Sequence, residues 1–249
     1  LADDTELNPE VIRERHADEW VDFQAWRVAK LCAKMREAIH EIAPGTEFYL
    51  YSGYQTPDNP LRYGIDWEYV GQMRACDVAE AGYGRPAEAV RETVRVLDGI
   101  PLVCGVLVIP HSVNELQPVR PLTRAVLLRR MLDSTGGILM YTRMEMDGRS
   151  LLAVSDISRL VADYEELFLQ SELQPLGDAD PASVQVLRGD GATLVCVMNT
   201  GTKAYSQALT LPGDAGGGRE YYTGEAVKTG QEVTCSLEPG EVAVYVLEE

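Results

Sequence analysis

Apolar and polar residues alternate in two ways over about the first 170 positions. Apolar side chains recur every three to four residues in some segments, which predicts amphipathic helices, and form short continuous runs in others, which predicts buried strands. The expected strands are Glu47–Tyr54, Cys76–Ala81, Pro101–Ile109 and Ile138–Tyr141. The expected helices are Trp20–Ile42, Asp66–Met73, Ala87–Leu97, Leu122–Leu132 and Ser150–Leu169. About four β–α units in this order are typical of a parallel sheet.

The pattern changes between Pro175 and Pro181, after which no helical period is found. The expected strands there are Val184–Arg188, Thr193–Asn199, Tyr205–Leu211, Glu220–Tyr222, Glu232–Leu237 and Val242–Leu247. Turn residues separate them at the spacing of a small antiparallel sandwich. We interpret Gly216-Gly217-Gly218 as an exposed loop tip, because it lacks the strand, the helix and the following Lys-Ser/Thr of a phosphate-binding loop.

The fold class that follows is α/β, with half of a (β/α)8 barrel in front of a β-sandwich. We assign residues 1–175 to the carboxyl-terminal half of a barrel and residues 182–249 to the sandwich. A whole barrel needs eight such units in about 250 residues. Half a barrel has two open sheet edges, which invite further pairing. Two arrangements stay open: an amino-terminal half that is missing here, or a homo-oligomer in which two copies close one barrel.

The charge and the apolar runs of the chain exclude some classes of binding partner. The chain has 22 basic and 39 acidic residues, for a net charge of −17, which argues against a nucleic-acid partner. The longest apolar run, Ile100–Pro110, is too short to span a bilayer, so we expect no membrane partner. The chain starts at Leu1 without a signal-peptide pattern, which suggests a processed or excised chain and leaves the cytoplasm and secretion both open.

The five cysteines are scattered without metal-ligand spacing. We expect buried free thiols, with a disulfide between Cys196 and Cys235 as the alternative. No cofactor motif is found, so neither a metal nor a cofactor is expected.

Candidate chemistry is sought at the carboxyl ends of the strands, where β/α barrels carry their active sites. A pair of carboxyl groups can cleave a glycosidic bond, and aromatic side chains can stack on sugars. The candidate catalytic residues are Glu80, Glu145 and Asp77. The candidate substrate-binding residues are Tyr51, Tyr54, Gln55, Tyr83, His111, Tyr141 and Arg143.

Each candidate also has a structural interpretation. Asp77 and Glu80 are three positions apart, so in a strand their side chains point to opposite faces. Asp77 can cap the start of its strand, and Glu80 can pair with Arg85. The tyrosines can pack a barrel rim, His111 can be a solvated loop residue, and the Asp147-Gly148 turn can cap a helix.

Several segments together resemble a known family. They are Trp20–Arg27, Phe48–Tyr54, Tyr63–Trp67, Asp77–Gly84 and Gly136–Tyr141. They look like the later half of the barrel in family-42 β-galactosidase-like glycoside hydrolases and their uncharacterised relatives, which often carry carboxyl-terminal β-domains.

The resemblance implies that Tyr51, Tyr83, Ile109 and Tyr141 end the fifth to eighth barrel strands. The family's acid/base Glu would then fall before or near Leu1, and its nucleophile would end the seventh strand. That strand, Pro101–Ile109, has no carboxylate here. Either the nucleophile comes from elsewhere, with Glu80 and Glu145 as the best candidates, or the chain does not hydrolyse glycosides by the usual double displacement.

Two hypotheses follow. The first is a β-galactosidase-like hydrolase that acts on a β-linked glycan by carboxylate acid/base chemistry. The alternative is a non-catalytic carbohydrate-binding or scaffold domain derived from a glycosidase barrel. Both have a carbohydrate as partner.

Overall fold

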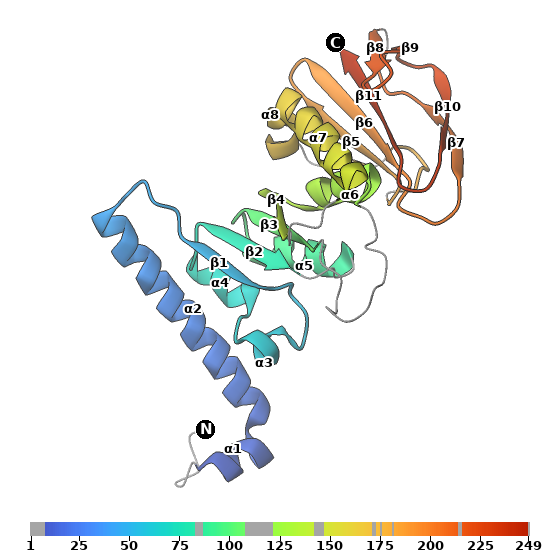
Figure 1. Cartoon of the computed structure of the whole chain (residues 1–249). Helices are drawn as coiled ribbons and strands as arrows, with labels where there is room; N and C mark the ends of the chain where they lie inside the picture. The colour runs from blue at the N-terminus through green and yellow to red at the C-terminus, as the bar shows by residue number, and fades with distance from the viewer. Residues whose placement is uncertain are drawn as a thin grey trace. The chain divides into compact units, whose positions relative to one another are not determined.

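A computed structural model describes residues 8–82, 87–107, 122–141, 147–170, 173–174, 176–180, 182–213 and 216–248 (Figure 1). The chain forms two compact units. Unit 1 comprises Leu1–Leu107 and Asp133–Tyr141, and unit 2 comprises Val108–Leu132 and Thr142–Glu249. None of the described helices has the length and apolar character needed to cross a membrane.

Unit 1 is built on a parallel sheet of four strands. They are β1 (Tyr49–Gly53), β2 (Val78–Gly82), β3 (Leu102–Leu107) and β4 (Gly137–Tyr141), in that spatial order. Every neighbouring pair is parallel. The predicted parallel sheet is therefore confirmed, and its membership of a half-barrel stays a prediction.

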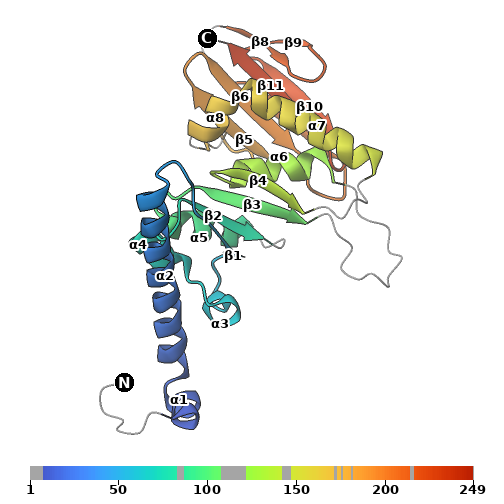
Figure 2. The same ribbon diagram turned by 60° about the vertical axis from the view of Figure 1, so that its left-hand side comes forward.

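The helices of unit 1 are α1 (Pro9–Arg15), α2 (Ala17–Ile42), α3 (Asn59–Tyr63), α4 (Trp67–Met73) and α5 (Ala87–Leu97). One face of the sheet packs against α2, α4 and α5. Ala79, Ala81, Leu102 and Cys104 alternate along β2 and β3 and join one core with residues of α2, α4 and α5. In both views α2 lies beside α4 and runs on past the sheet (Figures 1 and 2). The sequence pattern did not predict the short helices α1 and α3.

Unit 2 is a sandwich with helices packed on it. Its strands are β5 (Val184–Gly189), β6 (Ala192–Met198), β7 (Tyr205–Thr210), β8 (Gly217–Glu220), β9 (Ala226–Lys228), β10 (Glu232–Leu237) and β11 (Val242–Glu248). They form a five-stranded sheet in the order β5-β6-β11-β8-β9 and a two-stranded sheet of β7 and β10. The pairs are antiparallel. A shared apolar core includes Val186, Val195, Leu209 and Leu237.

Three helices assigned from sequence to the barrel half belong largely to unit 2. They are α6 (Arg124–Asp133), α7 (Gly148–Asp163) and α8 (Glu165–Gln170). The Ala125 N–H donates to the Gly240 carbonyl over 3.1 Å, and the Tyr221 hydroxyl donates to the Asp163 carboxylate over 2.6 Å. The predicted boundary between residues 175 and 182 therefore falls inside unit 2.

Other details differ from the sequence prediction. Gly217 and Gly218 lie in β8, so the loop tip predicted for Gly216–Gly218 is wrong. The single helix predicted over Ser150–Leu169 is divided at Tyr164. Tyr221 and Tyr222 form a turn instead of a strand, and β9 was not predicted. All five cysteines are buried free thiols, which excludes a Cys196–Cys235 disulfide in this structure.

Candidate functional site

The face of the unit 1 sheet opposite the helices carries Tyr51 and Glu80 side by side. The two residues are register partners in β1 and β2, and Val103 of β3 is the next partner in the row. Residues in register on parallel strands point to the same face. Tyr51 is 39% exposed and Glu80 is half-buried. This row joins an aromatic ring to a carboxyl group, two groups that glycan chemistry uses.

The Tyr51 side chain runs along this face toward the carboxyl end of the sheet. A Cβ added at Gly82 would lie 2.9 Å from the Tyr51 hydroxyl oxygen. Gly82 is the register partner of Gly53, and a Cβ at Gly105 would lie 3.0 Å from the Gly82 Cα. Gly82 therefore makes room for the Tyr51 ring, whereas a Cβ at Gly53 would meet Asn59 and Tyr63, and Gly53, Gly82 and Gly105 are all buried.

Glu80 is the one acidic residue in the four strands of this sheet, β1 to β4 as the structure describes them. Its charge contributes to raising the pKa of the exposed Tyr49 phenol, although the hydrogen bond from that phenol to Glu47 is the main cause. The carboxylates of Glu47 and Glu80 therefore both disfavour ionisation of the Tyr49 phenol on this face of β1.

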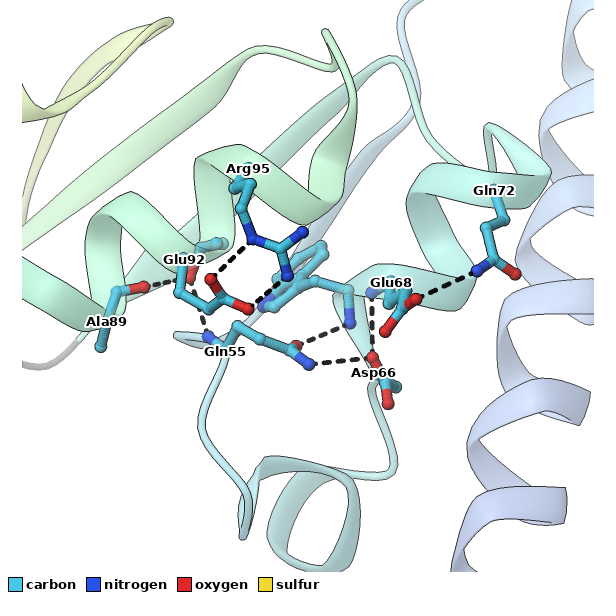
Figure 3. Close-up of polar contacts among 9 residues, drawn as sticks. Gln55, Asp66, Glu68, Gln72, Ala89, Glu92 and Arg95 are labelled. Carbon is cyan, nitrogen blue, oxygen red and sulfur yellow. Dashed lines mark hydrogen bonds and ion pairs between the residues drawn. The ribbon is translucent and has the colours of Figure 1, made fainter.

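The loop after β1 is fixed to two helices by Gln55 (Figure 3). Its side-chain oxygen accepts the Trp67 N–H over 3.0 Å, and its side-chain nitrogen donates to Asp66 over 3.0 Å. The Gln55 backbone N–H donates to the Thr93 hydroxyl over 2.8 Å, and that hydroxyl donates to the Ala89 carbonyl over 2.7 Å. Asp66 also caps α4 by accepting the Glu68 N–H. Gln55, predicted as a substrate contact, thus joins β1 to α4 and α5.

Tyr54 is a core residue. It is 1% exposed and packs in the cluster that includes Trp67. The indole N–H of Trp67 donates to the Gly53 carbonyl over 2.6 Å, which fixes the end of β1. The burial of Tyr54 places it away from the open face, in contrast to the substrate contact predicted for it.

Asp77 lies at the amino end of β2, away from the carboxyl end where the site was sought. It accepts hydrogen bonds from Arg36 at 2.7 Å and from the Phe48 N–H at 2.8 Å, and the His40 ring nitrogen lies 2.8 Å away. Burial is the largest influence on its pKa and raises it, but these hydrogen bonds together outweigh burial and hold the pKa below its ordinary value. Asp77 is thus the strand cap of the structural interpretation, and the candidate site does not include it.

The other predicted residues fall outside the described part of the chain. Tyr83, His111, Arg143 and Glu145 lie in segments 83–86, 108–121 and 142–146, which the structure does not describe. Tyr141 ends β4, and its side chain is likewise not described. Sequence reasoning missed the glycines that accompany Tyr51; a glycine in each of the strands YLYSG, VAEAG and LVCGVL was the available signal. No group of three His, Cys, Asp or Glu side chains suited to a metal occurs among the described residues.

Solved glycoside hydrolases share this fold. An α-amylase from Anoxybacillus aligns with 97% of this chain and 63% of its own, with a TM-score of 0.60 and 14% identity. An α-amylase from Geobacillus thermoleovorans, solved with acarbose, aligns with 96% of this chain and 65% of its own, with a TM-score of 0.54 and 13% identity. A GH30 endoxylanase from Clostridium papyrosolvens aligns with 89% of this chain and 61% of its own, with a TM-score of 0.52 and 12% identity.

The chain thus spans less than two thirds of each of these three structures. No family model and no curated protein sequence matches it. The comparisons establish a glycosidase-like fold and no particular glycosidase family.

Proposed function

We propose that this chain acts in the hydrolysis of glycosidic bonds, with Glu80 as one of the reacting carboxyl groups. The observation that carries the proposal is the placement of Glu80 beside Tyr51 on the open face of the parallel sheet. The glycosidase-like fold supports it.

The reaction needs a second carboxyl group. Retaining glycosidases separate the two by about 5–5.5 Å, and inverting ones by about 6.5–9.5 Å. Glu145 is the second group in this proposal, because in the sequence it comes shortly after β4, and barrel active sites are built from the segments that follow the strands. One residue donates a proton to the leaving oxygen, and the other attacks the sugar or activates water.

Tyr51 is the proposed sugar contact. Its hydroxyl lies against the buried Gly82 and its ring is partly exposed, so the exposed part of the ring is the surface on which a sugar would stack. The resemblance to β-galactosidase-like enzymes makes β-galactosides the first substrates to test. Starch and xylan follow, because structural neighbours are an α-amylase and an endoxylanase.

The test compares the wild-type chain with Glu80→Gln on nitrophenyl β-galactoside, starch and xylan. Removing a reacting carboxyl group lowers the rate by about 10²–10⁴-fold, and we expect that loss in kcat. Glu47→Gln is the matched control, because Glu47 is an exposed carboxylate that bonds to Tyr49 two residues before Tyr51.

Equal thermal unfolding of the three proteins would show that any loss is chemical. Unchanged turnover in Glu80→Gln would contradict the role of Glu80. Glycan binding without turnover by the wild type would contradict hydrolysis and favour the carbohydrate-binding alternative.

A further inference from the structure

Helix α3 lies on the end of β1 through two of its side chains. Asn59 and Tyr63 are four positions apart, so they share one face of the helix. A Cβ added at Gly53, the last residue of β1, would lie 2.6 Å from the Asn59 side-chain oxygen and 2.9 Å from the Tyr63 ring. Glycine at position 53 therefore lets the Tyr63 ring lie against the carboxyl end of the strand, the end at which barrel active sites are built.

The Tyr51 and Tyr63 rings lie over neighbouring strands of the sheet. Gly53 and Gly82 are register partners, and adjacent strands are about 4.8 Å apart. The Tyr63 ring lies against the Gly53 position, and the Tyr51 ring and hydroxyl lie against the Gly82 position. Gly53 is two residues after Tyr51, so both positions belong to the open face. Two aromatic rings are thus neighbours on the face that carries Glu80.

Tyr63 is exposed, but the helix that carries it is firmly anchored. Tyr63 is 50% exposed, whereas Asn59 is only 1% exposed and its side-chain nitrogen donates to the Ile65 carbonyl over 2.7 Å. Gly64 ends α3 in the left-handed conformation, and its N–H donates to the Pro60 carbonyl over 2.9 Å. The ring is therefore held in place before a ligand binds, which lowers the entropic cost of binding.

We propose that Tyr63 stacks on a second sugar unit of the glycan whose first unit contacts Tyr51. The proposal rests on the proposed function, because Tyr51 and Glu80 define where the first unit lies. A tyrosine ring offers an apolar face to a sugar ring and a hydroxyl at its rim. The two rings lie over different strands, so a first unit on Tyr51 leaves Tyr63 for the next unit. The ligand class is therefore an oligosaccharide, for which Tyr63 is a specificity-determining residue.

Calorimetric titration in the Glu80→Gln background measures this contact without turnover. The probes are maltotriose, xylotriose and β-1,4-galactotriose, each compared with its monosaccharide. At least one trisaccharide should bind more tightly than its monosaccharide, and Tyr63→Ala should raise the Kd of that trisaccharide about five- to tenfold. The Kd of the monosaccharide should stay unchanged, which reports that the rest of the site is intact. Tyr63→Phe keeps the ring and should retain the affinity for the trisaccharide.

Tyr49→Ala is the matched control. Tyr49 is 53% exposed and lies on the same face of β1 as Tyr51, but at the amino end of the strand. This variant should leave every Kd unchanged. An unchanged Kd of the trisaccharide in Tyr63→Ala would overturn the proposal, and so would the absence of binding by all three trisaccharides.

Failure of this proposal and failure of the proposed hydrolysis give different results. Trisaccharide binding that depends on Tyr63, in a chain whose wild type hydrolyses no glycan, would support the second sugar contact and contradict the hydrolysis alone. Turnover that is lost in Glu80→Gln, together with a trisaccharide Kd that Tyr63→Ala leaves unchanged, would overturn the second sugar contact and leave the hydrolysis standing.

Discussion

Arg36 of α2 and Asp77, just before β2, are joined by a charged hydrogen bond of 2.7 Å from Arg36 Nε to Asp77 Oδ1, and Arg36 Nη2 lies 2.7 Å from the same oxygen. The other carboxylate oxygen accepts the Phe48 N–H that precedes β1. One side chain thus fixes a helix and the starts of two strands. We expect Asp77→Ala to lower the free energy of unfolding by about 2 kcal/mol, because it removes charged hydrogen bonds and leaves the Phe48 N–H without this acceptor.

Urea denaturation measures this loss. Asp58→Ala is a suitable control, because the pair of Asp58 with Arg62 is more exposed and spans a single helical turn. Equal losses in the two variants would contradict the importance of the Asp77 contacts.

The stabilisation by Asp77 should depend on pH. Its folded-state pKa lies below the ordinary value, which is about 3.9 for an unfolded chain. The unfolded state therefore takes up the proton first as the pH falls, so the stabilisation is complete above about pH 4 and disappears as the pH drops through the folded-state pKa. The difference in unfolding free energy between wild type and Asp77→Asn should shrink between pH 7 and pH 3. A difference that stays constant over this range would contradict the shift.

Gly218 should tolerate no side chain. A Cβ at this position of β8 would collide with the Val246 carbonyl oxygen and lie 2.9 Å from the Leu247 side chain on β11. Gly218→Ala should therefore cost about 1–3 kcal/mol, measured by thermal or urea unfolding. At the neighbouring Gly217 an added Cβ would meet nothing within 4 Å, so Gly217→Ala should cost much less. Similar costs at the two positions would show that β8 does not approach β11 this closely.

The five thiols should react slowly in the native protein. All are buried and free, and burial raises the pKa of Cys76 and Cys196 to about 12. Because the thiolate is the reactive form, Ellman's reagent should label few sites before unfolding and five afterwards. A reductant should leave the Tm unchanged, whereas a fall in Tm would reveal a disulfide.

Local sequence signals located the elements of the fold well. The predicted helix Ala87–Leu97 agrees with α5 at both ends, because Pro86 precedes an amphipathic pattern. The break at Tyr164 between α7 and α8 has no Gly or Pro signal. The Tyr164 ring contacts Tyr221, far along the chain, at 6.0 Å between ring centroids. The close approach of β8 to β11 at Gly218 likewise depends on residues far along the chain, so the local sequence does not predict it.

The site was predicted only in part. The sequence placed Tyr51 and Glu80 near strand ends, but the β1–β2 register that makes them neighbours could not be derived from either strand alone. The predicted strand Glu47–Tyr54 runs one residue past β1, which ends at Gly53. The exact register matters, because a shift of one residue moves a side chain to the other face of a strand. The partners of Asp77 in α2 are 37 and 41 residues away, so no local pattern indicated them.

The division of the chain into two units limits how it can be dissected. The polypeptide passes from unit 1 to unit 2 after Leu107, returns at Asp133 and passes over again after Tyr141. A truncation that starts at Thr142 would keep the sandwich strands but lose all of α6, including the Ala125 N–H that donates to Gly240. A truncation that ends at Leu107 would keep β3 but lose its partner β4. No single cut releases both units whole, so expression of unit 1 alone calls for a short designed linker from Leu107 to Asp133 in place of residues 108–132.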